Sequence, residues 1–427
     1  MKLVLADFGQ ALTVSKDSFV VREKGKTLSQ TPFYKTNEIV VSSKNAVSVD
    51  SLLWASLYNV DVVFCLHNGK PLCFLHSIKD SGNVKTRLNQ LRAYDSKKGL
   101  EIAKSVLIQK IGNENNLLKH LDLKPYEQNR RVPKPSEIAR IEAEKLSTNL
   151  RLKLTHIEEN FSVWFYAQIF PLFPKWLRIS NRMKRNATDP LNNLLNLSFE
   201  ILMWKVMKAT VKSKLEPYLG FLHSEAWGKP SLVCDLMEPF RPYIIHFLLD
   251  YSKTLDPQDF KRTYFKNKLP RYFLTHEMTW NLIETLNKQL FEASIPLQRN
   301  RKIGFRMQFE TFIDEYVSSI AKTINAPSNE VAEHQFPDFA HLHISLQKAP
   351  QNPKEPPSRN IKPQKQIKTP TTKQEETLES LLEDSKSEDP TARAPMHVCV
   401  ECRFSMEDAL HCSGWMVFLP MFYGAKC

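Results

Sequence analysis

The residues with the clearest chemical potential lie in the stretch 216–242, which reads EPYLGFLHSEAWGKPSLVCDLMEPFRP. His223 follows a Gly-containing turn, and Asp235 and Glu238 come one helical turn apart after a second turn at 228–230. An imidazole that faces carboxylates is a ligand set for a hard-to-borderline divalent metal ion. The spacing therefore predicts a metal site, and the basic chain around it makes a phosphodiester the expected substrate.

A further acidic ligand is available upstream. Glu158 and Glu159 stand in front of the aromatic run 161–166, where we expect the junction of two helices. Taken alone, this pair is also typical of a solvated helix end. Combined with His223 and Glu238, it suggests that Glu158 converges with them on one cation from three separate helical elements. Oxygen and imidazole ligands suit Mg²⁺ or Mn²⁺, and the imidazole favours Mn²⁺.

The charge of the chain indicates a polyanionic partner. Lysine and arginine number 59 against 46 acidic residues, a net charge of +13, and the pI is about 9.2. The stretch 160–188 contains no acidic residue, and its basic side chains interleave with aromatic ones. Solvated helix faces would show a similar pattern. We expect DNA contacts from this stretch and from two basic residues near the metal site: Lys175, Arg178, Arg182, Lys184, Arg185, Lys229 and Arg241.

The cysteines and the apolar stretches indicate a cytoplasmic protein. Seven scattered cysteines, an odd number, argue against an extracellular disulfide framework and for a reducing compartment. The N-terminal run MKLVLADFGQ reaches an aspartate before a signal-peptide core forms. The apolar stretch 415–423 is too short to span a bilayer. We expect neither secretion nor membrane insertion.

The elements that must position these residues fall into two domains, which predicts an α+β fold. Residues 1–83 form short apolar runs with β-branched residues, including a hairpin with an Asn-Gly turn at 67–70 and one short helix at 49–58. Helical periodicity dominates 84–330, and Thr188-Asp189-Pro190 is a helix start. We expect a small N-terminal β-rich domain and a larger all-helical catalytic domain. The helical segments predicted with bounds are 96–121, 136–154, 277–291 and 308–324.

The C-terminal part differs in composition. Residues 331–395 are expected to be a disordered linker, since they are rich in proline and contain a basic block followed by an acidic one. The tail 396–427 contains a Cys-x-x-Cys pair at Cys399 and Cys402, together with further cysteines and histidines. These could close a structural Zn²⁺ site, although a second paired spacing is absent and a loosely folded appendage is the alternative.

Five stretches of the chain resemble the CRISPR-associated spacer-acquisition integrase, the metal-dependent DNA nuclease of CRISPR adaptation. The two most specific strings are Leu-Gly-Phe-Leu-His, which ends at His223, and Asp-Leu-Met-Glu-Pro-Phe-Arg-Pro at 235–242. The others are Ser-Gly-Asn-Val at 81–84, Ile157-Glu158 and Asp-Pro-Leu-Asn at 189–192. Together the matching stretches extend over about residues 1–325.

The resemblance implies an enzyme that inserts foreign DNA fragments into a CRISPR array, by attack of a 3′-hydroxyl on a target phosphodiester. It implies that Glu158, His223 and Glu238 are the catalytic metal ligands, while Asp235 is considered for an auxiliary contact. Glu159 stands where the family often has glycine, which leaves open which of the two carboxylates faces the metal. It further implies a prokaryotic cytoplasmic homodimer, paired through the β domain, that joins a small companion adaptation protein in a heterohexamer on double-stranded DNA.

Two other functions share some of these features. A general branched-DNA repair nuclease would use the same metal ligands but would cut junctions without a companion protein or a repeat sequence. A non-catalytic DNA-binding scaffold would have the basic faces without metal dependence. The complete set of Glu158, His223 and Glu238 disfavours the scaffold.

Overall fold

The structure is a computed structural model, and it describes residues 1–342 apart from 68, 76–83, 127–132, 265–268, 300–301 and 333; for 297–305 only the backbone is described. The described residues belong to one compact unit, Met1–Pro357. Within them, no helix is both long and apolar enough to cross a membrane. The basic and acidic blocks of the predicted linker and the tail 396–427, with its Zn²⁺ hypothesis, lie outside the described residues.

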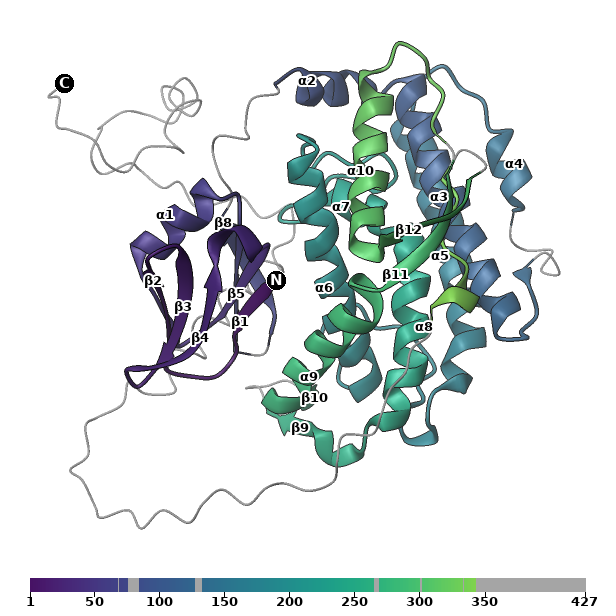
Figure 1. Ribbon diagram of the computed structural model, residues 1–427. Helices are drawn as coiled ribbons and strands as arrows, with labels where there is room; N and C mark the ends of the chain where they lie inside the picture. The colour runs from purple at the N-terminus through teal and green to yellow at the C-terminus, as the bar shows by residue number, and fades with distance from the viewer. Residues whose placement is uncertain are drawn as a thin grey trace, which may run out of the picture. The chain divides into compact units, whose positions relative to one another are not determined.

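The N-terminal region consists of two four-stranded sheets and one helix (Figure 1). One sheet has the order β1-β5-β7-β8 and the other the order β4-β3-β2-β6. The elements are β1 (Lys2–Leu5), β2 (Gln10–Ser15), β3 (Ser18–Glu23), β4 (Lys26–Pro32), β5 (Glu38–Ser42), β6 (Ala46–Val47), α1 (Val49–Leu57), β7 (Asp61–Cys65) and β8 (Pro71–Leu75).

Burial explains why these segments are strands. Every residue of β5 is buried, as expected for a central strand that pairs in parallel with both β1 and β7. Apolar side chains from both sheets, including Leu12, Phe19 and Ile39, form one hydrophobic core. The predicted hairpin at 67–70 is confirmed, because β7 and β8 pair antiparallel around it. The short helix expected at 49–58 is α1, which begins after the N-cap Ser48.

The second region is mostly helical and has its own core. Its helices are α2 (Val84–Ala93), α3 (Lys97–His120), α4 (Pro135–Ala139), α5 (Thr148–Ile169), α6 (Pro190–Lys212), α7 (Ser231–Met237), α8 (Arg241–Tyr251), α9 (His276–Leu286) and α10 (Phe309–Asn325). Two antiparallel hairpins interrupt them: β9 (Phe260–Thr263) with β10 (Arg271–Leu274), and β11 (Ser294–Arg299) with β12 (Lys302–Gln308).

Local signals in the sequence place several of these helices correctly. The Asp189 side chain accepts a hydrogen bond from the Asn192 N–H at 2.7 Å, so α6 begins at Pro190 as predicted. Ser96 caps α3 in the same way. The expected α+β class is confirmed, with the addition of the two hairpins that helical periodicity did not reveal.

Two boundaries differ from the prediction. The single helix expected at 136–154 is wrong, because α4 ends at Ala139 and α5 starts only after Ser147. The buried Lys104 ammonium donates to the carbonyl oxygens of Ala139 and Ile141, at 3.1 and 2.9 Å, which stabilises this break. In addition, Phe339 is buried against the helical core, so packed structure continues past residue 330, where the linker was expected to begin.

Candidate active site

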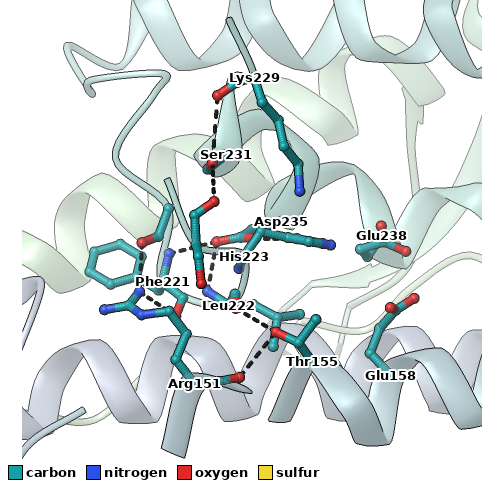
Figure 2. A network of polar contacts seen from close by, with 12 residues as sticks. Arg151, Thr155, Glu158, Phe221, Leu222, His223, Lys229, Ser231, Asp235 and Glu238 are labelled. Atoms are coloured by element: carbon teal, nitrogen blue, oxygen red, sulfur yellow. Dashed lines mark hydrogen bonds and ion pairs between the residues drawn. The ribbon is translucent and has the colours of Figure 1, made fainter. Parts of the chain in front are cut away.

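Three chain segments bring the predicted ligands to one region. Glu158 lies in the middle of α5, not at the expected junction of two helices. His223 lies in the loop before α7, and Glu238 follows the last residue of α7, where it opens a short 3-10 turn. Figure 2 shows the carboxylates of Glu158 and Glu238 turned toward each other, with His223 and Asp235 beside them. Glu158 is buried and Glu159 is exposed, so Glu158 is the inward carboxylate of the pair.

A lysine that the sequence analysis did not select joins the two carboxylates. Lys110 of α3 is fully buried, and its Nζ contacts Glu158 Oε1 and lies 2.7 Å from Glu238 Oε2. It also donates a hydrogen bond to Ser162 Oγ at 2.9 Å. Arg241 holds the other oxygen of Glu238, with Nη2 3.1 Å from Oε1. One buried ammonium and one guanidinium therefore fix the position of both carboxylates.

These cations also keep the carboxylates ionised. Burial by itself would raise the pKa of Glu158, but the adjacent Lys110 ammonium holds it well below its ordinary value. The pKa of Glu238 is likewise lowered, because Arg241 and Lys110 outweigh its desolvation. In its protonated form the His223 ring would lower both carboxyl pKa values further, so the ring lies within electrostatic range of both.

Asp235 organises the loop that carries His223. Its buried carboxylate accepts hydrogen bonds through Oδ2 from the N–H groups of Phe221 and Leu222, at 2.6 and 2.8 Å. Oδ1 accepts from the His223 N–H at 2.9 Å and from the ring Nδ1 at 2.7 Å. Since a carboxylate only accepts, Nδ1 carries a proton, and in the neutral form of the ring Nε2 keeps a lone pair for a metal ion. Both oxygens of Asp235 are thereby engaged with the loop.

Helix α5 clamps the same loop from the other side. The buried Arg151 donates to the carbonyl oxygens of Gly220 and Phe221, at 2.9 and 2.8 Å. Thr155 Oγ1 donates to the Leu222 carbonyl at 3.0 Å. Figure 2 shows these contacts as dashed lines. The loop is therefore fixed at its N–H groups by α7 and at its carbonyl groups by α5, which positions His223 relative to Glu158.

The donor set fits a divalent metal ion. Among the described residues, no three His, Cys, Asp or Glu side chains are close enough as they stand to form a metal cluster. Two carboxylate oxygens nevertheless contact one shared cation, the Lys110 ammonium, and an imidazole with a free Nε2 lies in their electrostatic range. Two oxygen ligands and one nitrogen ligand are a suitable partial shell for Mg²⁺ or Mn²⁺.

The basic residues predicted to bind DNA have different surroundings. Lys175, Arg178, Lys184 and Arg185 are exposed in the segment between α5 and α6, and Lys229 is half-buried in the turn before α7. Lys184 interacts electrostatically with Glu158 and Glu238, which places it near the carboxylates. The Arg182 guanidinium is engaged with Asn192 and Asn196 at 3.0 and 2.6 Å, and Arg241 with Glu238. These two arginines therefore have structural partners, and DNA contact stays a prediction for all seven.

Sequence reasoning missed Lys110 and Arg151, although a signal for Lys110 was present. In α3 the buried stripe includes Val106, Leu107 and Ile111, and Lys110 falls on the same face at helical spacing. A lysine on an apolar stripe requires a buried partner, because an unpaired ammonium in the interior is very costly. That requirement could have directed attention to the acidic residues of neighbouring helices.

A β-rich region joined to a helical region, with a buried carboxylate pair and a histidine close to exposed basic side chains, defines the class of phosphodiester-processing enzymes that act on nucleic acid. The sequence match is more specific. The family model described as "CRISPR associated protein Cas1" matches residues 3–288, and the chain belongs to this family.

Known proteins support this membership. The chain is 26% identical over 298 residues to the CRISPR-associated endonuclease Cas1 of Korarchaeum cryptofilum (strain OPF8), covering 66% of this chain and 87% of that protein. A casposase bound to integration product has a similar fold, with 20% identity, coverage of 77% of this chain and 92% of that chain, and a TM-score of 0.62. A chain of a Cas6-RT-Cas1–Cas2 complex also has a similar fold, with 17% identity, coverage of 81% of this chain and 36% of that chain, and a TM-score of 0.59. The expected family and the enzyme class, a CRISPR-associated endonuclease, are confirmed.

Proposed function

We propose that this Cas1 protein is a metal-dependent DNA endonuclease and integrase, which inserts DNA fragments into a CRISPR array by attack of a 3′-hydroxyl on a target phosphodiester. The observation that carries the proposal is the pair of buried, ionised carboxylates, Glu158 and Glu238, which face one shared cation beside His223. Membership of the Cas1 family and the similar fold of a casposase bound to integration product support it.

In the proposed mechanism, Glu158, His223 and Glu238 would hold one Mg²⁺ or Mn²⁺ ion. When bound, such an ion would lower the pKa of the attacking hydroxyl and stabilise negative charge on the phosphoryl oxygens. The protein supplies the geometry: Asp235 fixes the tautomer and orientation of the His223 ring, and Arg241 fixes the Glu238 carboxylate. Asp235 is therefore proposed as a positioning residue and not as a ligand.

The basic segment between α5 and α6 is proposed to guide the DNA. Lys184 lies in electrostatic range of the two carboxylates, and exposed cations around it can contact phosphates. We also propose the assembly that the family resemblance implies: double-stranded DNA as substrate, a homodimer, and a small companion adaptation protein in a heterohexamer. The similar fold in a Cas6-RT-Cas1–Cas2 complex supports a second Cas protein as partner. A prokaryotic cytoplasm is the proposed place of action.

A plasmid-integration assay tests the proposal. A short duplex with a free 3′-hydroxyl is incubated with a plasmid that carries CRISPR repeats, Mn²⁺ and the companion protein. We expect Glu158→Ala, His223→Ala and Glu238→Ala each to reduce joining by a factor of about 100 or more. The matched control is Glu159→Ala, which removes the neighbouring exposed carboxylate and should join normally.

Two results would contradict the proposal. Undiminished joining by the three alanine variants would show that these residues do not hold the catalytic ion. Cleavage of branched DNA without any joining, independent of repeats and companion protein, would favour a repair nuclease instead.

A metal-free control completes the assay: the integration reaction without divalent ions should give no product for any variant.

A further inference from the structure

Lys110 has surroundings that the proposed mechanism does not use. It is a fully buried lysine on α3, and its ammonium reaches Glu158 on α5 and Glu238 after α7. Its attraction to Glu238 Oε2 is ionic, because this oxygen has no directional hydrogen bond within the described part of the chain. The ammonium thus contacts one oxygen from each of the two carboxylates that the proposed function assigns to a metal ion.

The charges of the groups in direct contact with one another are already balanced. Glu158 and Glu238 carry two negative charges, and Lys110 and Arg241 carry two positive ones. Burial raises the pKa of the nearby Glu114 to about 8, and a closer Lys110 ammonium would lower it, so Glu114 takes up negative charge when the ammonium moves next to it. A divalent ion added to this set brings two further positive charges into a buried site, where repulsion from an adjacent ammonium is weakly screened.

A second position for the ammonium exists close by. Glu114 lies one turn further along α3, with Oε1 3.9 Å from Lys110 Nζ. Its Oε2 is buried and has no hydrogen-bond partner within the described residues. Ser162 Oγ, at 2.9 Å from Nζ, is a neutral acceptor for the same ammonium. A small rotation of the flexible lysine side chain could therefore exchange an ionic contact with Glu238 for a contact with Glu114.

We propose that Lys110 is a resident counter-ion of the active site: it holds Glu158 and Glu238 together, competes with the divalent ion for their oxygens, and moves to Glu114 when that ion binds. The inference rests on the proposed function, because it takes Glu158 and Glu238 as ligands. It makes Lys110 a positioning residue that weakens metal binding in the absence of DNA. Negative phosphates of bound DNA would compensate the added charge, so DNA and metal should strengthen each other's binding.

The test is a Mn²⁺ titration of the full-length protein without DNA, in which the concentration of free Mn²⁺ is measured by electron paramagnetic resonance. We expect Lys110→Met to bind Mn²⁺ about tenfold more tightly than the wild type, because a competing charge is gone. Lys110→Arg keeps the charge and should stay within about twofold of the wild type. In chelator, Lys110→Met should melt at a lower temperature than the wild type, and Mn²⁺ should raise its melting temperature by more.

Glu114→Met gives a second, independent test that does not depend on folding of the Lys110 variant. It removes the alternative acceptor, so we expect Mn²⁺ binding several-fold weaker than in the wild type. Unchanged or weaker Mn²⁺ binding by folded Lys110→Met overturns the inference, and so does unchanged binding by Glu114→Met if Lys110→Met does not fold. The proposed function itself is overturned if the wild type binds no Mn²⁺, or if Glu158→Ala binds Mn²⁺ as tightly as the wild type. If the wild type binds Mn²⁺ and Glu158→Ala loses this binding, but Lys110→Met does not bind Mn²⁺ more tightly, only the inference is overturned.

Discussion

Asp235→Asn tests most directly how the structure positions His223. The substitution keeps the size of the side chain but replaces one acceptor oxygen with an amide group that donates. In the structure one carboxylate oxygen accepts from the N–H groups of Phe221 and Leu222, and the other accepts from the His223 N–H and Nδ1. Whichever way the amide is oriented, two donors of the protein will face its NH₂ group.

The structure gives the size of the effect. A hydrogen bond to a charged group contributes about 1.5–3 kcal/mol, and a buried donor left unsatisfied costs about 1–3 kcal/mol. For two affected donors we expect the free energy of local opening of the loop to fall by about 3 kcal/mol or more. Amide exchange of residues 219–223 should then accelerate about 100-fold. In the orientation that places the NH₂ group at His223, Nδ1 would become the acceptor and the ring proton would move to Nε2, which should weaken Mn²⁺ binding by about 10–100-fold.

Hydrogen–deuterium exchange of this loop and a Mn²⁺ titration are the assays. The matched control is Asp250→Asn on α8, which alters an exposed pair with Lys253 and should change neither quantity measurably. Exchange within about threefold of the wild type, together with unchanged Mn²⁺ affinity, would refute the positioning role of Asp235.

Two further predictions concern packing and acid stability. Gly220→Ala would place a Cβ 2.7 Å from the Ser231 backbone and 2.9 Å from Asp235 Oδ2, so we expect a clearly lower melting temperature and weaker Mn²⁺ binding. The control is Gly112→Ala, which has open space in α3 and should be neutral or stabilising. Equal melting temperatures of the two variants would contradict this prediction. Lys205 and Lys208 outweigh burial and lower the pKa of Glu310 from 4.5 to about 2, so its contribution to stability is present above pH 4.5 and is lost as the pH falls toward 2. Glu310→Gln should therefore melt lower at pH 7 but lose less stability than the wild type over that interval, and parallel curves in scanning calorimetry would exclude the effect.

Short-range patterns explain why much of the fold was predictable. A helix cap acts over three residues, as between Asp189 and Asn192, and strand and helix periods are read within one element. The two hairpins of the helical region were harder to predict, because β9 and β10 have four residues each and because each hairpin is a two-stranded sheet set between helices. The false helix at 136–154 has a different cause: its break depends on Lys104, a residue of another helix.

For the active site, the sequence by itself determined the family and the ligand candidates, because Glu158, His223 and Glu238 lie in ordered strings that are recognisable without a structure. Only the tertiary structure decided how they are held. Lys110 meets Glu158 across 48 residues of chain, a contact that exists only when α3 packs on α5. We propose Asp235 as a support for His223 and not as an auxiliary ligand, because both its oxygens accept hydrogen bonds from the loop. Buried charges are paired by packing and desolvation, and these act between segments that are distant in sequence.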